Sequence, residues 1–152
     1  MKKFLYSLTQ CLWGLPQTLA GFVLFLANIR KKHYCYHGAI ITEWDSLSSV
    51  SLGLFLFVTK ERIPAVRRPD PDSRKKAGTP LVVHEYGHTV QSLILGPLYL
   101  PVVGLPSLLW ANCKKYVRMR MKGTPYSAFW TERTANMLGE MATKDISFRD
   151  NA

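Results

Sequence analysis

The sequence predicts an α+β protein with a membrane-associated helix at its N-terminus and a single domain after it. Three observations predict this class. An apolar stretch fills most of residues 1–32, a two-residue alternation follows within 33–59, and helical periodicity returns at residue 79. The 152 residues suffice for one domain with a modest core. We therefore expect a helix over 1–32 and one domain over 33–152.

The formal net charge of +10 indicates an anionic partner. Acidic membrane lipid and nucleic acid are both partners of this kind. The clustered apolar segments favour lipid, so no nucleic-acid partner is expected. The cysteines Cys11, Cys35 and Cys113 are odd in number and lack metal-type spacing. They are predicted to be free thiols in a reducing compartment.

The N-terminal stretch has a basic start followed by an apolar run to Ile29. A signal peptide is disfavoured because the run is long and no clear cleavage site follows. A spanning helix and a helix lying in the membrane interface both remain open. A stripe of polar and small residues recurs at helical spacing, which suits an interfacial helix or a spanning helix whose polar side packs on protein. The stripe consists of Lys3, Ser7, Gln10, Gly14, Gln17, Gly21, Asn28 and Lys32.

Residues 33–59 alternate with a period of two and are predicted to form a β-hairpin, with its turn at Asp45–Ser46. An edge of this hairpin is a candidate for holding an extended peptide by β-augmentation. His33, Cys35 and His37 share a strand face, but an incidental grouping is favoured over a metal site.

Residues 60–78 are predicted to be a basic loop. A solvated connector is favoured over a membrane-facing patch or a flexible lid.

The run His84-Glu85-Tyr86-Gly87-His88 has the pattern His-Glu-x-x-His. On a helix, His84 and His88 lie one turn apart and can bind one Zn²⁺, with Glu85 beside the metal as a general base. Thr79-Pro80 and Gly96-Pro97 are typical of a helix start and stop, which predicts a helix over 79–95. The expected core side is Val82, Val83, Tyr86, Val90, Leu93 and Ile94, and the expected polar side is His84, Glu85, His88, Gln91 and Ser92.

The uncharged apolar stretch around residues 96–111 is predicted to be a re-entrant helical hairpin that folds back near 104–106. A soluble core element is the alternative. A complete crossing of a bilayer is disfavoured, because it would separate the motif from the later ligand candidate. The cluster Lys114, Lys115, Arg118, Arg120 and Lys122 suits anionic headgroups.

Residues 125–139 are predicted to form a second helix, on which Glu132 and Asn136 share a face. Glu132 is a candidate third zinc ligand, and Asn136 is a candidate hydrogen-bond partner for a ligand imidazole. From the spacing alone, an exposed glutamate on an ordinary helix is an equally good interpretation.

The motif helix followed by Glu132, Ala135 and Asn136 resembles the gluzincin arrangement, and distantly the CAAX-prenyl-protease class, which has Asp where this chain has Asn136. The chain is also similar to small uncharacterised bacterial HEYGH proteins and to some toxin-module tails. The shared residues are His84 to His88, Gln91-Ser92, Leu95 to Leu100, Gly104 to Leu108, Trp130 to Glu132, Ala135-Asn136 and Leu138-Gly139. The resemblance implies a zincin-like domain with Glu132 as a zinc ligand, and it names no substrate.

The predicted function is a membrane-associated zinc metallopeptidase that acts on a peptide or protein substrate. Glu85 would activate the attacking water, and Tyr126, or else His33 or His37, would donate to the oxyanion. The expected location is the bacterial inner membrane, with the active site on the cytoplasmic side. A non-catalytic membrane-bound module with a structural or vestigial metal site is the main alternative, and a basic nucleic-acid-binding protein is a weaker one.

Overall fold

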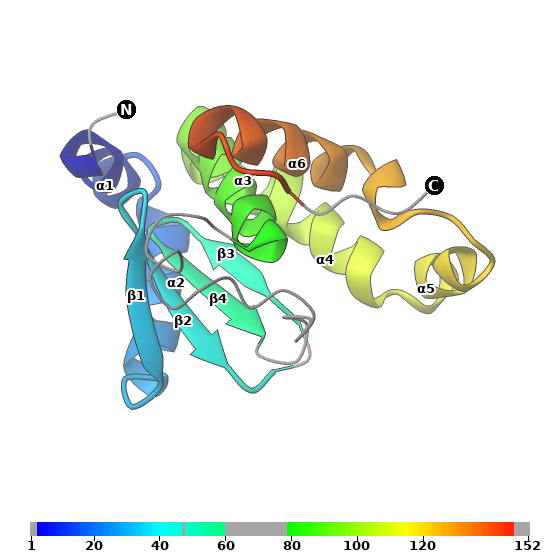
Figure 1. Cartoon of the computed structure of the whole chain (residues 1–152), viewed down its shortest axis with the longest axis horizontal. Helices are drawn as coiled ribbons and strands as arrows, with labels where there is room; N and C mark the ends of the chain where they lie inside the picture. The colour runs from blue at the N-terminus through cyan, green and yellow to red at the C-terminus, as the bar shows by residue number, and fades with distance from the viewer. Residues whose placement is uncertain (1–2, 47, 60–78, 148–152) are drawn as a thin grey trace.

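The computed structural model describes residues 3–46, 48–59 and 79–147. In this part of the chain, a four-stranded sheet lies beside a group of helices (Figure 1). The predicted α+β class is therefore confirmed. The predicted basic loop over 60–78 lies outside the described residues.

The N-terminal segment forms two helices, α1 (Lys3–Leu12) and α2 (Leu15–Ala27), bent by 100° from one another. The expectation of one continuous helix over 1–32 is wrong. The break falls at Trp13–Gly14, and Pro16 follows in the first turn of α2, where a proline is tolerated because no amide donor is needed there. Among the described residues, no single helix has the length and apolarity to cross a bilayer, although α1 and α2 meet that test as a bent pair.

The sheet contains β1 (Lys32–Tyr36), β2 (Ala39–Trp44), β3 (Val50–Leu52) and β4 (Phe55–Thr59) in the order β1-β2-β4-β3. The pairs β1–β2 and β3–β4 are antiparallel, and β2–β4 is parallel. The single hairpin predicted over 33–59 is wrong, because each expected strand is itself a tight hairpin.

The glycines within the alternating pattern explain these turns. His37 and Gly38 have φ values of 49° and 99°, which are typical of the tightest hairpin turns. Gly53 has φ of 60° and turns β3 into β4. The parallel pairing of β2 with β4 leaves β3 at the edge of the sheet nearest to α3.

The motif helix α3 (Pro80–Leu95) has the predicted bounds, and the Thr79 side chain caps it by accepting a hydrogen bond from Val82 N. It packs on the sheet through a core of Tyr6, Ala39, Ile41, Leu56, Val58, Val82 and Tyr86. The expected core side is correct for Val82 and Tyr86 but wrong for Ile94, which is exposed where the helix ends.

The apolar segment after α3 reverses at Gly96 and does not fold back at 104–106 as predicted. Gly96 has φ of 54° and opens a 3-10 turn, Gly96–Leu98. A π-helical turn, Leu100–Gly104, then runs directly into α4 (Leu105–Asn112). The wider π turn accommodates Pro106, whose ring would clash with a carbonyl of a regular α-helix.

The C-terminal part contains α5 (Lys114–Met121), a 3-10 turn (Tyr126–Ala128) and α6 (Trp130–Thr143). The expected second helix over 125–139 is displaced towards the C-terminus, since Gly139 lies inside α6 and does not end it. α6 runs alongside α3 (Figure 1), and this contact positions the candidate site.

Candidate metal centre

α3 and α6 approach each other closely because glycine occupies the contact on both helices. A Cβ atom on Gly87 would lie 1.8 Å from the carbonyl oxygen of Ala135, and a Cβ atom on Gly139 would lie 2.2 Å from that of Val83. No side chain fits at either position. The close approach brings the first turn of α6, which carries Glu132, up to the two motif histidines.

His84, His88 and Glu132 form a buried cluster between these helices. The Oε2 atom of Glu132 lies 3.2 Å from His84 Nε2 and 3.5 Å from His88 Nε2. His84 and His88 are 6% and 5% exposed, and Glu132 is fully buried. One donor atom from each of the three lies within 4.8 Å of the others, so the group can hold a metal ion. It is the only such group among the described residues.

Each imidazole is oriented by an amide oxygen on its other nitrogen. His84 Nδ1 donates to Asn136 Oδ1 at 2.6 Å, and His88 Nδ1 donates to Gln91 Oε1 at 2.7 Å. Because an amide oxygen only accepts, both Nδ1 atoms carry the proton and both Nε2 atoms are left as ligand atoms. Gln91 is itself fixed by donating to Thr131 O and Thr134 Oγ1 on α6.

The two carboxylate oxygens of Glu132 have different surroundings. Oε1 accepts from Ser107 Oγ at 2.5 Å and from Thr131 Oγ1 at 3.0 Å. Oε2 is buried, lacks a hydrogen-bond partner within residues 3–46, 48–59 and 79–147, and lies where the two Nε2 atoms converge. A buried carboxylate oxygen without a partner is costly. A cation bound at this point would satisfy it, so the residues present fit a metal ion.

The charges of the cluster are strongly coupled in the metal-free chain. Burial alone would raise the pKa of Glu132, but the two imidazoles of His84 and His88 that face its Oε2 atom hold this pKa well below its usual range. Burial alone would lower the pKa of His84, but Glu132 and Glu85 raise it to about 9. The metal-free cluster therefore favours a bound proton, which a metal ion has to displace.

Glu85 is held beside the cluster and is not part of it. Ser51 Oγ in β3 lies 2.6 Å from Glu85 Oε2 and 2.8 Å from the Glu85 carbonyl oxygen. Tyr99, fully enclosed next to these groups, donates to the Ser51 carbonyl. The edge strand therefore fixes the Glu85 carboxylate from the side opposite to α6.

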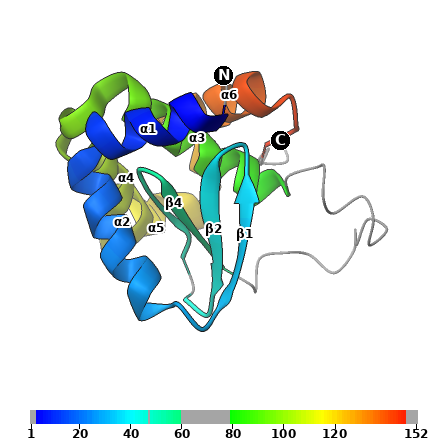
Figure 2. The same cartoon turned by 90° about the vertical axis from the view of Figure 1, so that its left-hand side faces the viewer.

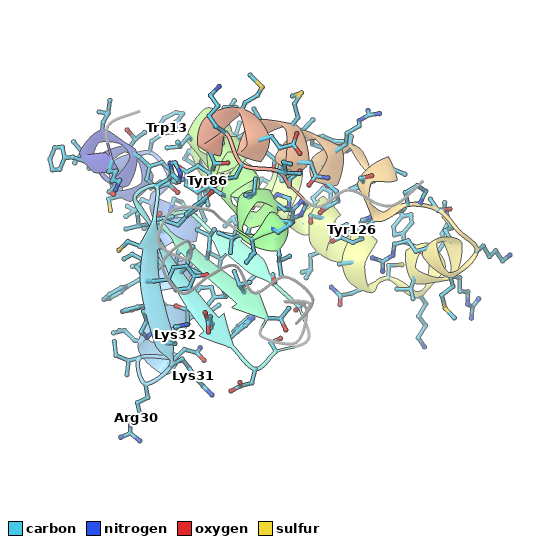
Figure 3. All side chains as sticks on the ribbon, in the orientation of Figure 1. Trp13, Arg30, Lys31, Lys32, Tyr86 and Tyr126 are labelled. Atoms are coloured by element: carbon cyan, nitrogen blue, oxygen red, sulfur yellow. The ribbon has the colours of Figure 1, made fainter. Side chains whose placement is uncertain are left out.

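A cleft lies in front of the cluster, between β3, α4 and the turn before α6. One lobe of about 360 Å³ is lined by His84, Glu85, His88 and Glu132 and by mostly apolar residues of β3 and α4. An adjoining lobe of about 670 Å³ shares His84 and Glu85 and extends to α5. Tyr126 lines both lobes, with its ring centre 6.4 Å from that of His84, and is seen beside α4 in Figure 3.

The structure brings together the predicted site residues His84, Glu85, His88, Glu132, Asn136 and Tyr126. The other predicted oxyanion donors are placed elsewhere. His33 contacts Thr42 and Ile29, and His37 packs on Tyr36 and Tyr86; neither lines the cleft. His33, Cys35 and His37 are not part of the group of possible metal ligands found among the described residues.

Sequence reasoning missed the serines that hold the two carboxylates, Ser51 and Ser107. No local pattern identifies them, because each reaches its partner across the fold. It also gave no role to Gln91, although Gln91 follows His88 by three residues on the polar side of the helix, and this spacing is a usable signal.

Comparison of the chain with protein-family models, with curated proteins and with solved structures finds no match.

Proposed function

We propose that this chain is a membrane-associated zinc metallopeptidase. The observation that carries the proposal is the unpartnered Oε2 of Glu132, which lies between two imidazole nitrogens whose ring partners leave them free to bind a metal. Two histidines and one glutamate are a donor set of catalytic zinc sites, which keep a fourth position open. Open space at the cluster is consistent with that requirement.

The chemistry is a hydrolysis in which water adds to a peptide carbonyl and the carbon–nitrogen bond then breaks. Bound zinc would polarise the carbonyl and acidify the attacking water. Glu85 accepts the proton of that water and returns it to the leaving amine. Ser51 keeps the Glu85 carboxylate oriented towards the cleft.

Tyr126 is suited to donate a hydrogen bond to the oxyanion. Burial and the nearby charges of Glu132 and Glu85 raise the pKa of its phenol. Its hydroxyl group therefore remains protonated at neutral pH and available as a donor.

The substrate is a peptide in extended conformation. β3 is an edge strand and lines the cleft together with α4, so that a peptide can lie along β3 by β-augmentation. The cleft walls include Leu52, Leu100, Leu105 and Leu108, which favours apolar side chains next to the scissile bond.

Membrane association rests on the inverted polarity of α1 and α2. Their polar side chains are buried: Gln10 donates to Thr89 O, and Gln17 donates to Ser92 Oγ and Gly96 O. Their large apolar side chains are exposed, namely Phe4, Leu5, Leu8, Leu12, Trp13, Leu15, Leu19, Phe22, Val23 and Leu26. An exposed apolar face of this size indicates a lipid or protein partner.

The exposed apolar face continues beyond these two helices. Trp13 lies at the corner between α1 and α2 (Figure 3) and packs directly against Gly96. Ile94, Leu98, Val102, Leu105 and Leu109 are also exposed. Figure 2 shows three elements on one side of the molecule, namely α2, α4 and the segment that follows α3. We assign this side to the lipid.

Basic residues at two places suit anionic headgroups. Arg30, Lys31 and Lys32 project at the far end of α2 (Figure 3), although Lys31 and Lys32 also pair with Asp45 and Glu43. On α5 and at Lys122 directly after it, the basic residues Lys114, Lys115, Arg118 and Lys122 are exposed, whereas Arg120 turns inwards. The free thiols and the basic balance favour the cytoplasmic side of a bacterial inner membrane.

The function is tested by metal content and hydrolysis together. Purified wild-type protein should bind about one zinc per chain, and His88→Ala and Glu132→Ala should lose it. Zinc-loaded wild type should cleave members of an apolar peptide library, and Glu85→Gln should retain zinc but lose cleavage. Cleavage that survives in Glu85→Gln, or wild type that takes up no zinc, refutes the proposal.

The membrane assignment is tested separately by vesicle flotation. Leu19→Glu with Val23→Glu, in the exposed face of α2, should abolish binding to vesicles that contain anionic lipid. Met141→Glu is a matched control, because Met141 is equally exposed but lies on α6. Equal flotation of both variants would contradict the assignment.

The depth of the cluster favours one second candidate, a non-catalytic membrane module with a structural metal. Glu132 is fully buried, and Ser107 closes over it from α4. Replacement of zinc by cobalt separates the two candidates. A hydroxamate inhibitor should change the cobalt absorption spectrum if the fourth position is open, and should leave it unchanged if the site is closed.

A further inference from the structure

Arg120 belongs to the expected basic cluster of residues 114–122. Unlike the other basic residues of that cluster, its side chain turns towards the protein. Its guanidinium carbon lies 5.7 Å from the ring centre of Trp110 and 5.1 Å from that of Tyr126. One Nη2 hydrogen is donated to the carbonyl oxygen of Ala111 at 2.7 Å. Among the described residues, Arg120 has no carboxylate partner.

The surroundings of Arg120 fix its guanidinium plane. Trp110 is itself held, since it stacks on Phe129 with an interplanar angle of 13° and donates to Tyr126 O at 3.0 Å. Contact with the rings of Trp110 and Tyr126 immobilises the planar guanidinium group and supplies cation–π attraction. The Nε–H of Arg120 is nevertheless buried and has no hydrogen-bond partner in the part of the chain that the structure describes. The position therefore holds an oriented guanidinium group.

The Arg120 side chain lies at the proposed active-site cleft. Arg120 lines the 670 Å³ lobe together with His84, Glu85 and Asn136. Tyr126 stands between the two groups, 5.1 Å from Arg120 and 6.4 Å from the His84 ring. These two contacts span about two or three residues of an extended peptide. A substrate held at the metal cluster therefore reaches Arg120.

We propose that Arg120 is a carboxylate-binding subsite, so that the substrate carries a carboxylate within about three residues of the scissile bond. The carboxylate is either an acidic side chain or the end of the substrate chain. The inference rests on the proposed peptidase function and names a feature of its substrate. The planar guanidinium group of Arg120 matches a planar carboxylate. The nearby charges of Glu85 and Glu132 disfavour a ligand with more negative charge, such as phosphate.

The test is a binding measurement with three probes on zinc-loaded Glu85→Gln protein, which cannot turn them over. The first probe is an acetylated alanine–leucine hexapeptide with a C-terminal amide. The second is the same peptide with a free C-terminal carboxylate, and the third is the amide with one internal glutamate. At least one acidic probe should bind about tenfold more tightly than the neutral amide. The probe that gains affinity identifies the source of the carboxylate.

Three variants in the same background assign the preference to Arg120. Arg120→Gln should remove it, and Arg120→Lys, which keeps the charge without the fork, should retain part of it. Arg118→Gln is the matched control, because Arg118 is exposed on the same helix, and it should retain the full preference. Circular dichroism verifies the fold of each variant.

Equal affinity for all three probes, no binding of any probe, or a preference that persists in Arg120→Gln would each overturn the subsite. These outcomes are distinguishable from failure of the proposed function. If the acidic probes bind more tightly but wild-type protein hydrolyses no peptide, the carboxylate subsite stands and the peptidase function is refuted. If wild-type protein hydrolyses peptides but the acidic probes bind no more tightly, the peptidase function stands and the subsite is refuted.

Discussion

The contact between α3 and α6 makes a sharp prediction about Gly87. Its replacement by alanine places a Cβ atom 1.8 Å from the backbone carbonyl oxygen of Ala135. Real Cβ atoms essentially never approach closer than 3.0 Å, and backbone atoms cannot swing aside as a flexible side chain would. The two helices therefore have to separate by about 1 Å, at a cost of about 3 kcal/mol or more in unfolding free energy.

The separation also acts on the metal cluster, because Glu132 is carried by α6 and both histidines by α3. Metal–ligand distances tolerate changes of about 0.2 Å, so a shift of about 1 Å removes Glu132 from coordination. We expect Gly87→Ala to bind zinc at least about a hundredfold more weakly than wild type. Competition with a chromophoric zinc chelator measures the affinity, and thermal unfolding with and without zinc measures the stability.

A matched control separates this effect from a general response to replacing a helical glycine. Gly104 lies in helical backbone, and a Cβ atom there would meet nothing nearer than 3.6 Å. Gly104→Ala should therefore keep its zinc and its stability. Gly139→Ala, with a contact of 2.2 Å on the same interface, should repeat the loss. Folded Gly87→Ala with the zinc affinity of wild type would refute the close-contact reasoning and remove Glu132 as a ligand.

Three further outcomes follow from the hydrogen bonds and charges of the cluster. Asn136→Ala should weaken zinc binding by about ten- to a hundredfold in the same chelator assay, whereas Asn136→Asp should not, because a carboxylate also accepts from His84 Nδ1. Gln91→Ala should weaken zinc binding by a similar factor, because Gln91 orients His88. Unchanged zinc affinity in Gln91→Ala would contradict this role of Gln91. The pKa of His84 is raised to about 9 in the metal-free chain, so the stability it contributes is complete below about pH 6.5 and is lost as pH rises through 9. Metal-free protein should therefore become less stable to denaturant across this range, and zinc affinity should increase, with a proton released that calorimetry in two buffers detects.

The features that the sequence predicted correctly are those in which the signal is local. The cap formed by Thr79 and the reversal at Gly96 bound α3 within a few residues along the chain. The spacing of His84 and His88 fixes their common face through the helical period alone. Glu132 and Asn136 share a face for the same reason, although only the packing of α6 on α3 decides that this face meets the histidines.

The features that the sequence did not predict depend on contacts that form only in the folded chain. Gly38 and Gly53 interrupt an alternation that otherwise indicates long strands, and the pattern alone does not separate a turn from a strand that contains a glycine. Gly139 was expected to end a helix, but it serves the contact with Val83. Ser51 and Ser107 receive their roles from carboxylates far away in the sequence.

The N-terminal helices also bear on the site, because they contact the motif helix. Tyr6 of α1 is completely buried in the core with Val82 and Tyr86 of the motif helix. Gln10 donates to the carbonyl oxygen of Thr89, which follows His88 directly. The N-terminal helices, whose outer face we propose to contact lipid, thus hold α3 by their inner face, while the glycine contact with α6 holds it from the other side. Removal of residues 1–32 would expose that core and free the motif helix, so the N-terminal helices belong to the scaffold of the site and are not a detachable anchor.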